Sequence, residues 1–232
     1  MKSSVTKMRF KLTLVAVVML FVTTAANWPD PRLDAISSKL ATHNSPVYCE
    51  NDPTEWNNWE VMLGRQPNTT GGFTWHPGIS ARRHPFFMQF DPNTVYIGPE
   101  ACGGLHAILT DTTVITANYE AYGIGVLIHE DMHQALNSND EGLVECTAYR
   151  QFKDVTVNYF NVPLTTTIVV PYTVRTIKYY YKRVKGKRVR KHKVVYVLKY
   201  RTDTIDNPFL FTLIRDEDFQ HSNMPPAYRT YC

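Results

Sequence analysis

The sequence predicts an α+β fold, in which a long helix and a partner helix pack beside a small sheet, with a long basic β-hairpin added to them. Residues 118–152 contain two stretches typical of helices, separated by a polar turn. From Thr165 to Arg201 the pattern changes to β-branched and aromatic residues around a Lys-Gly-Lys turn. The 232 residues, 44% of them hydrophobic, are enough for one medium-sized domain with a core.

The N-terminus has the features of a secretory signal peptide. Basic residues precede an almost unbroken apolar run from Leu12 to Val22, and small residues follow at 24–26. We therefore assign residues 1–26 to a signal that is cleaved after Ala26, and we expect a secreted, extracellular protein. The alternative is an uncleaved anchor, but the run is shorter than the roughly 20 apolar residues that span a bilayer.

Charge and cysteine content limit the classes of function. The chain is +4 overall, but the signal carries four of its 25 basic residues and no acidic one. The mature chain therefore has 21 basic and 21 acidic residues and is neutral. The overall charge therefore does not indicate nucleic-acid binding. All the cysteines follow the signal, and an even number in a secreted chain predicts two disulfides, whose pairing the sequence leaves open. They are Cys49, Cys102, Cys146 and Cys232. Zinc ligation by cysteine is less favoured, because no CxxC spacing occurs.

Residues 27–164 are expected to form the main region, and residues 207–232 a C-terminal segment that packs back on it. Residues 27–93 are rich in Pro, Asn and Trp and predict an irregular lead-in with short elements. Residues 94–97 predict a short strand, and residues 100–109 a helix.

The best-defined helix is expected over residues 118–136. Gly123 and Gly125 each weaken its first half by about 1 kcal/mol relative to alanine. After the polar turn, Asp140 can cap a second helix over residues 141–152. A short turn of this kind allows the second helix to fold back along the first.

The first helix carries His129-Glu130-Asp131-Met132-His133, a histidine pair with a glutamate after its first member. Residues four apart lie on one helix face, so His129 and His133 can direct a ring nitrogen at the same metal ion. Glu130 points to the neighbouring flank, where it can take a proton from a water on the metal and pass it to a leaving group. The alternative is two surface histidines on an amphipathic helix. The charge of Asp131 favours this alternative, because the residues between the glutamate and the second histidine of such metal-binding motifs are usually uncharged.

A catalytic zinc site needs a third protein ligand and keeps one position open for water. Glu141 and Glu145 on the second helix are the candidates. In an antiparallel pair, Glu141 lies near the corner and Glu145, one turn later, lies level with the histidines. We therefore predict Zn2+ ligation by His129, His133 and Glu145. Glu130 would be the catalytic base and Glu141 would orient a histidine, although the roles of the two glutamates could be exchanged.

This histidine pair, followed by a helical glutamate, resembles the zincin metallopeptidases, specifically the gluzincin type. Residues 145–148 look like the ExxA form of the third-ligand helix in several such families, and residues 126–146 are similar to secreted metallopeptidase-like proteins of actinobacteria and their phages. The resemblance implies a zincin-like catalytic region that hydrolyses peptide bonds. The gap between His133 and Glu145 is shorter than in well-known gluzincins. Their oxyanion-stabilising Tyr or His has no matched position, and Tyr149 is a candidate.

Residues 165–206 predict a β-hairpin that carries much of the positive charge. Twelve Lys and Arg lie between residues 175 and 201, with five tyrosines among them and no acidic residue from 155 to 202. One interpretation is an arm that contacts a polyanion or the cell envelope, for example teichoic acid, anionic lipid headgroups or nucleic acid. The other is a solvated hairpin whose lysines prevent edge-to-edge aggregation, or which docks on the acidic remainder of the chain.

The leading hypothesis is a secreted zinc metallopeptidase that acts on a peptide or protein substrate through a metal-activated water. One alternative is a secreted binding module that uses the basic hairpin and has no catalysis. Another is a zinc enzyme that acts on a non-peptide amide. We expect no specific nucleic-acid target, and no membrane span after the signal is removed.

Overall fold

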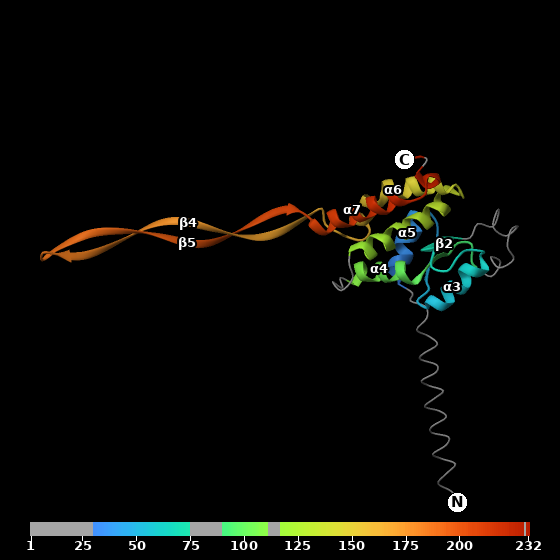
Figure 1. Ribbon diagram of the computed structural model, residues 1–232, viewed down its shortest axis with the longest axis horizontal. Coiled ribbons are helices and arrows are strands. Elements are labelled where there is room, and N and C mark those ends of the chain that lie inside the picture. The colour runs from blue at the N-terminus through green and yellow to red at the C-terminus, as the bar shows by residue number, and fades with distance from the viewer. Residues whose placement is uncertain (1–29, 75–89, 111–116, 230) are drawn as a thin grey trace, which may run out of the picture. The chain divides into compact units, whose positions relative to one another are not determined.

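The structure is a computed structural model that describes residues 30–74, 90–110, 117–229 and 231–232 (Figure 1). It is a mixed α+β structure, as predicted, and it divides into two compact units: Pro163–Pro208, and the rest of the chain. The expected signal peptide lies outside the described residues. Within the described ranges, no helix is long and apolar enough to cross a membrane.

The larger unit contains a small sheet and most of the helices. In chain order its elements are α2 (Pro31–Leu40), β1 (Val47–Cys49), α3 (Pro53–Met62), β2 (Gly72–Thr74), β3 (Val95–Ile97), α4 (Pro99–Thr110), α5 (Ala117–Leu136), α6 (Glu141–Asn158), α7 (Pro208–Asn223) and the 3-10 helix η2 (Pro226–Arg229). The sheet has the order β1-β3-β2, with β1 parallel and β2 antiparallel to β3. The predicted strand at 94–97 is thus the central strand, and it is buried throughout.

Two well-formed helices, α2 and α3, lie in the region for which the sequence predicted an irregular lead-in. Asp30 and Asp52 cap them, and each carboxylate accepts a hydrogen bond from a backbone N–H of the first turn. Pro31 and Pro53 occupy the first helical positions, where a residue without an N–H is tolerated. These prolines therefore mark helix starts and not loops.

Helices α5 and α6 confirm the two predicted helices, although α6 continues to Asn158 where the sequence predicted an end at 152. The carboxylate of Asp140 accepts hydrogen bonds from two backbone N–H groups of the first turn of α6, as expected for its cap. Both predicted disulfides are present. Cys49–Cys102 joins β1 to α4, and Cys146–Cys232 joins the C-terminal segment to α6.

The packing of α4 against α5 explains a glycine that the helix propensity alone disfavours. A Cβ on Gly123 of α5 would lie 2.5 Å from the carbonyl oxygen of Ala101 and 2.8 Å from the backbone nitrogen of Leu105, both in α4. Gly104 of α4 meets the backbone of Tyr119 in the same way. The two helices therefore pack backbone to backbone at these positions.

Gly123→Ala should consequently lower the thermal stability. Alanine favours a helix by about 1 kcal/mol over glycine, but its methyl group would press on the backbone of α4, and overpacking of this kind costs about 1–3 kcal/mol or more. Gly103→Ala is the matched control, because a Cβ at Gly103 meets nothing within 4 Å. In thermal unfolding, Gly103→Ala should raise Tm and Gly123→Ala should lower it. An equal gain from both substitutions would argue against this close helix approach.

The second unit is the predicted hairpin. β4 (Thr165–Val184) and β5 (Lys187–Asp206) pair antiparallel without interruption, from Thr165 opposite Asp206 to Val184 opposite Lys187. Lys185 and Gly186 form the turn with φ of 50° and 77°. Positive φ at both central residues is the feature of a tight hairpin turn whose twist matches that of the strands.

Candidate metal centre

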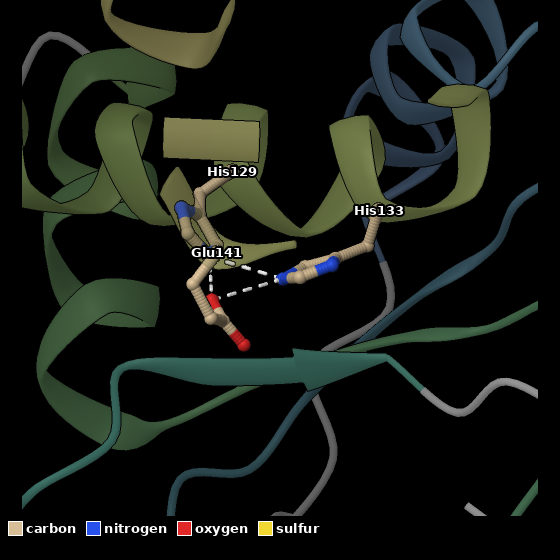
Figure 2. A group of neighbouring side chains, drawn as sticks. All are labelled: His129, His133 and Glu141. Carbon is tan, nitrogen blue, oxygen red and sulfur yellow. Dashed lines mark hydrogen bonds and ion pairs between the residues drawn. The ribbon is translucent and has the colours of Figure 1, made fainter. Parts of the chain in front are cut away.

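The candidate site lies where α6 packs against α5. His129 and His133 are one turn apart on α5, and Glu141 is the first residue of α6, directly after its cap Asp140. Figure 2 shows the two imidazole rings and the Glu141 carboxylate pointing toward one another. Asn137, with a φ of 49°, lies in the turn between the two helices.

Three ligand-type atoms converge in this site. The Glu141 Oε2 atom lies 3.2 Å from His129 Nε2 and 3.4 Å from His133 Nε2, and the two Nε2 atoms are 3.1 Å apart. The three side chains offer atoms that all lie within 4.8 Å of one another. The histidine side chains are 16% and 9% exposed, whereas that of Glu141 is 42% exposed, so the group reaches solvent on the Glu141 side.

The hydrogen bonds of the two rings place a hydrogen on each Nδ1 atom. His129 Nδ1 lies 2.9 Å from a carboxylate oxygen of Glu145, and His133 Nδ1 lies 2.8 Å from the backbone carbonyl oxygen of Ser138. Both partners are acceptors, so each Nδ1 donates. In neutral rings, the two Nε2 atoms then present lone pairs to each other and to the Glu141 carboxylate. Three acceptors in this arrangement need a cation between them.

The electrostatics of the site favour positive charge at its centre. Burial would lower the pKa of His129, but the hydrogen bonds to Glu141 and Glu145 outweigh it and raise that pKa to about 10. For His133, burial is outweighed in the same way, mainly by Glu141, and its pKa is also raised. Burial would raise the pKa of Glu141, but the two histidines hold it well below its usual range. Either protons or a metal ion would satisfy this group.

Glu145, which the sequence favoured as the third ligand, lies behind His129. Its buried carboxylate accepts from His129 Nδ1 at 2.9 Å through Oε2 and from His221 Nδ1 at 3.0 Å through Oε1. It thus has the orienting position that the sequence favoured for Glu141, and the alternative assignment of the two glutamates fits the geometry. Glu145 does lie level with His129 along α6, but its carboxylate contacts the Nδ1 atom of that ring and not the Nε2 atom.

Helix α7 supports Glu145 from a part of the chain that the sequence reasoning missed. The ring of Tyr149 stacks on His221 with 4.1 Å between centroids, and the Tyr149 hydroxyl donates to Asp218 at 2.7 Å. The oxyanion candidate Tyr149 is therefore engaged by Asp218. His221 is 76 residues from Glu145, and a lone histidine at that separation carries no spacing signal.

Glu130 lies on the flank of α5 that faces β2. Its side chain is 7% exposed and accepts a hydrogen bond from the Thr74 hydroxyl at 3.2 Å. A Cβ on Gly72 would lie 2.9 Å from Glu130 Cγ, so the strand passes directly over this side chain. Glu130 is thus beside the converging group without being part of it.

Asp131, the unusual residue of the pattern, has a separate structural role. It is fully buried, and its Oδ1 atom accepts from the Ser37 hydroxyl of α2 at 2.6 Å. Burial raises its pKa well above the usual value. The carboxyl therefore joins α5 to α2.

Gly125 makes room for a buried acid of α7. A Cβ on Gly125 would lie 2.8 Å from Glu217 Oε2, and Glu217 is 6% exposed. Burial, and then the negative charges of Glu145 and Asp218, raise the pKa of Glu217 to about 8. At neutral pH this carboxyl is therefore mostly protonated.

The raised pKa gives a signed dependence of stability on pH. An acid that binds its proton more tightly in the folded state stabilises the fold fully below its unfolded pKa, near 4.5, and loses that contribution as the pH rises to about 8. Glu217→Gln removes the titration, so its Tm should exceed that of the parent at pH 9 by more than it does at pH 5. A difference that is constant across this range, in unfolding followed by circular dichroism, would contradict the assignment.

Comparisons of the chain with protein-family models, with curated proteins and with solved structures give no match. The resemblance to zincins therefore stays a prediction that rests on the motif residues.

Proposed function

We propose that this protein is a zinc-dependent hydrolase of peptide bonds, in which His129, His133 and Glu141 are the metal ligands. The observation that supports it best is the convergence of the two Nε2 atoms and one carboxylate oxygen. Two imidazole nitrogens and a carboxylate oxygen are one of the ligand sets of catalytic zinc sites, which keep a fourth position open. The exposed side of Glu141 gives this position a route to solvent.

The contacts around the rings support the same proposal. Histidine ligands of zinc almost always donate their second N–H to a carboxylate or a carbonyl, which fixes the ring and raises its basicity. Glu145 has this position for His129, and the Ser138 carbonyl has it for His133. Two surface histidines on an amphipathic helix would not need such partners, since their polar atoms would be hydrated.

The chemistry that follows needs a base and a group that stabilises negative charge. A zinc ion held by the three ligands would lower the pKa of a bound water to roughly 7 and polarise a carbonyl. Glu130 would accept the proton of the attacking water and deliver it to the leaving nitrogen, while Thr74 orients its carboxylate. Burial, and then the charge of Glu141, raise the pKa of Tyr228, so its hydroxyl remains a donor close to these carboxylates.

The peptide substrate is supported by the position of β2. In the sheet order β1-β3-β2 of the described residues, β2 is an outer strand. An extended peptide can add to such an edge through main-chain hydrogen bonds. Since β2 passes directly over Glu130, a peptide bound there would lie beside the proposed base.

Elemental analysis of zinc in purified protein tests the proposal. We expect about one zinc ion per chain in the parent and much less in His133→Ala, because the two remaining ligands leave the ion under-coordinated. His43→Ala, at an exposed histidine near the end of α2, is the control and should keep the parent content. A parent that holds no zinc, even when refolded with zinc present, would refute the metal site.

A further inference from the structure

The register of the hairpin separates its lysines from its arginines. Directly paired residues of antiparallel strands share a face, and alternate residues point to opposite faces. One face, which we call the lysine face, carries every lysine of the two strands: Lys178, Lys182, Lys187, Lys191, Lys193 and Lys199. The opposite face, the arginine face, carries Arg175, Arg183, Arg188 and Arg190. The remaining arginine, Arg201, lies on the lysine face and pairs with Asp203 at 3.1 Å.

The tyrosines are divided unequally between these faces. Four of the six in the strands lie on the arginine face, and they are Tyr179, Tyr181, Tyr196 and Tyr200. The residues Tyr196 and Tyr200 are 69% and 64% exposed. Covering a large exposed aromatic ring with a ligand removes apolar surface from water, which contributes favourably to the free energy of binding.

Two of the arginines stack on the other two tyrosines of the arginine face. The Arg190 guanidinium lies 3.9 Å from the centroid of Tyr179, and that of Arg188 lies 4.5 Å from the centroid of Tyr181. Stacking on a ring leaves the N–H edges of the guanidinium available, and these edges match the oxygens of a phosphate in bidentate geometry. The arginine face therefore offers oriented phosphate donors and aromatic surfaces together.

The charge and its distribution decide among the possible occupants. A second copy of the hairpin would bring like charges together, since its strands and turn carry twelve basic residues. A lipid bilayer would need one face free of charge, whereas both faces carry cations. Inorganic polyphosphate would pair with the basic side chains, but it has no bases to stack on the tyrosine rings. A single-stranded nucleic acid uses both, with phosphates on the cations and bases stacked on the rings.

We propose that the arginine face of the β4–β5 hairpin binds single-stranded nucleic acid, without sequence preference. The chain's phosphates would contact the arginines, and its bases would stack on Tyr196 and Tyr200. This binding site shares no residue with the candidate metal centre. A test of nucleic-acid binding is therefore independent of a test of the proposed hydrolase activity.

The first test compares two variants of the full mature chain that each remove four charges. One is R175Q/R183Q/R188Q/R190Q on the arginine face, and the other is K178Q/K182Q/K191Q/K193Q on the lysine face. Binding of a labelled mixed-sequence single-stranded oligonucleotide is followed by fluorescence anisotropy over a range of salt concentrations. We expect the loss of affinity in the arginine-face variant to be at least tenfold larger than the loss in the lysine-face variant. Its slope of log affinity against log salt should also fall by about 3, from roughly 0.7 per phosphate contact over four contacts. Equal losses from both variants would show that binding follows net charge alone and would overturn the proposal.

The second test uses the tyrosines, with a pair on each face. Tyr196→Ala with Tyr200→Ala should weaken binding about fivefold or more per ring, whereas Tyr172→Ala with Tyr180→Ala on the lysine face should change it little. Both pairs remove two strand-forming residues, and circular dichroism shows whether the hairpin persists in each. Inorganic polyphosphate, a duplex of the same sequence and anionic vesicles serve as competing ligands. Competition by any of them as strong as that by the single strand would overturn the proposal.

Discussion

Glu130→Gln should reduce the rate of peptide hydrolysis by about 100- to 10,000-fold, the usual contribution of a general base, while the zinc content stays that of the parent. The glutamine amide has nearly the same shape and can keep the hydrogen bond from Thr74. It cannot accept the proton of the attacking water. Because Glu130 is not one of the three converging groups, the ligand set of the metal is unchanged.

The measurement combines zinc analysis with kcat and kcat/KM for a peptide substrate found by screening. Asp131→Asn is the matched control, since Asp131 is the next residue of the same helix, is fully buried and contacts Ser37 instead of the site. It should keep a rate near that of the parent. Undiminished hydrolysis in Glu130→Gln would exclude the mechanism. Equal losses in both variants would point to a general distortion of α5.

The parts of the fold with local signals could be predicted from the sequence. The cap at Asp140 and the Lys185-Gly186 turn are fixed by neighbouring residues, so α6 starts where predicted and the hairpin has its predicted bounds. The helices after Asp30 and Asp52 have equally local signals, but an aspartate-proline pair is also typical of loops. The identity of the glycine contacts between α4 and α5 could not be predicted, since it depends on how two helices cross.

The candidate site divides in the same way. The spacing of His129 and His133 is local, and it predicts that their rings share a face. The choice between Glu141 and Glu145 depends on which ring nitrogen points at which carboxylate, and that is set by side-chain rotation and not by position along a helix. His221 comes from α7, and only tertiary packing brings it to Glu145.

Glu141→Gln should weaken zinc binding more than Glu145→Gln does. In the first variant a ligand loses its charge, and the two Nε2 atoms keep only a neutral amide as their third partner. In the second, His129 keeps its position in the site, but its Nδ1 donates to an amide oxygen instead of a carboxylate. Loss of such a supporting partner typically costs 10- to 100-fold in metal affinity. Both variants keep the length of the side chain, so their difference reports the role of the charge.

Competition with a chelator of known zinc affinity measures the two losses on one scale. Glu145→Gln should still bind zinc stoichiometrically when the free zinc concentration is raised about 100-fold, because its three ligands remain. Glu141→Gln should fail to saturate under that condition. The reverse order would mean that Glu145 swings onto the metal and that Glu141 is the supporting residue, as the position of Glu145 along α6 first indicated. Since one imidazole ring meets both carboxylates, on its Nε2 and its Nδ1 sides, the order of these two losses identifies the nitrogen that faces the metal.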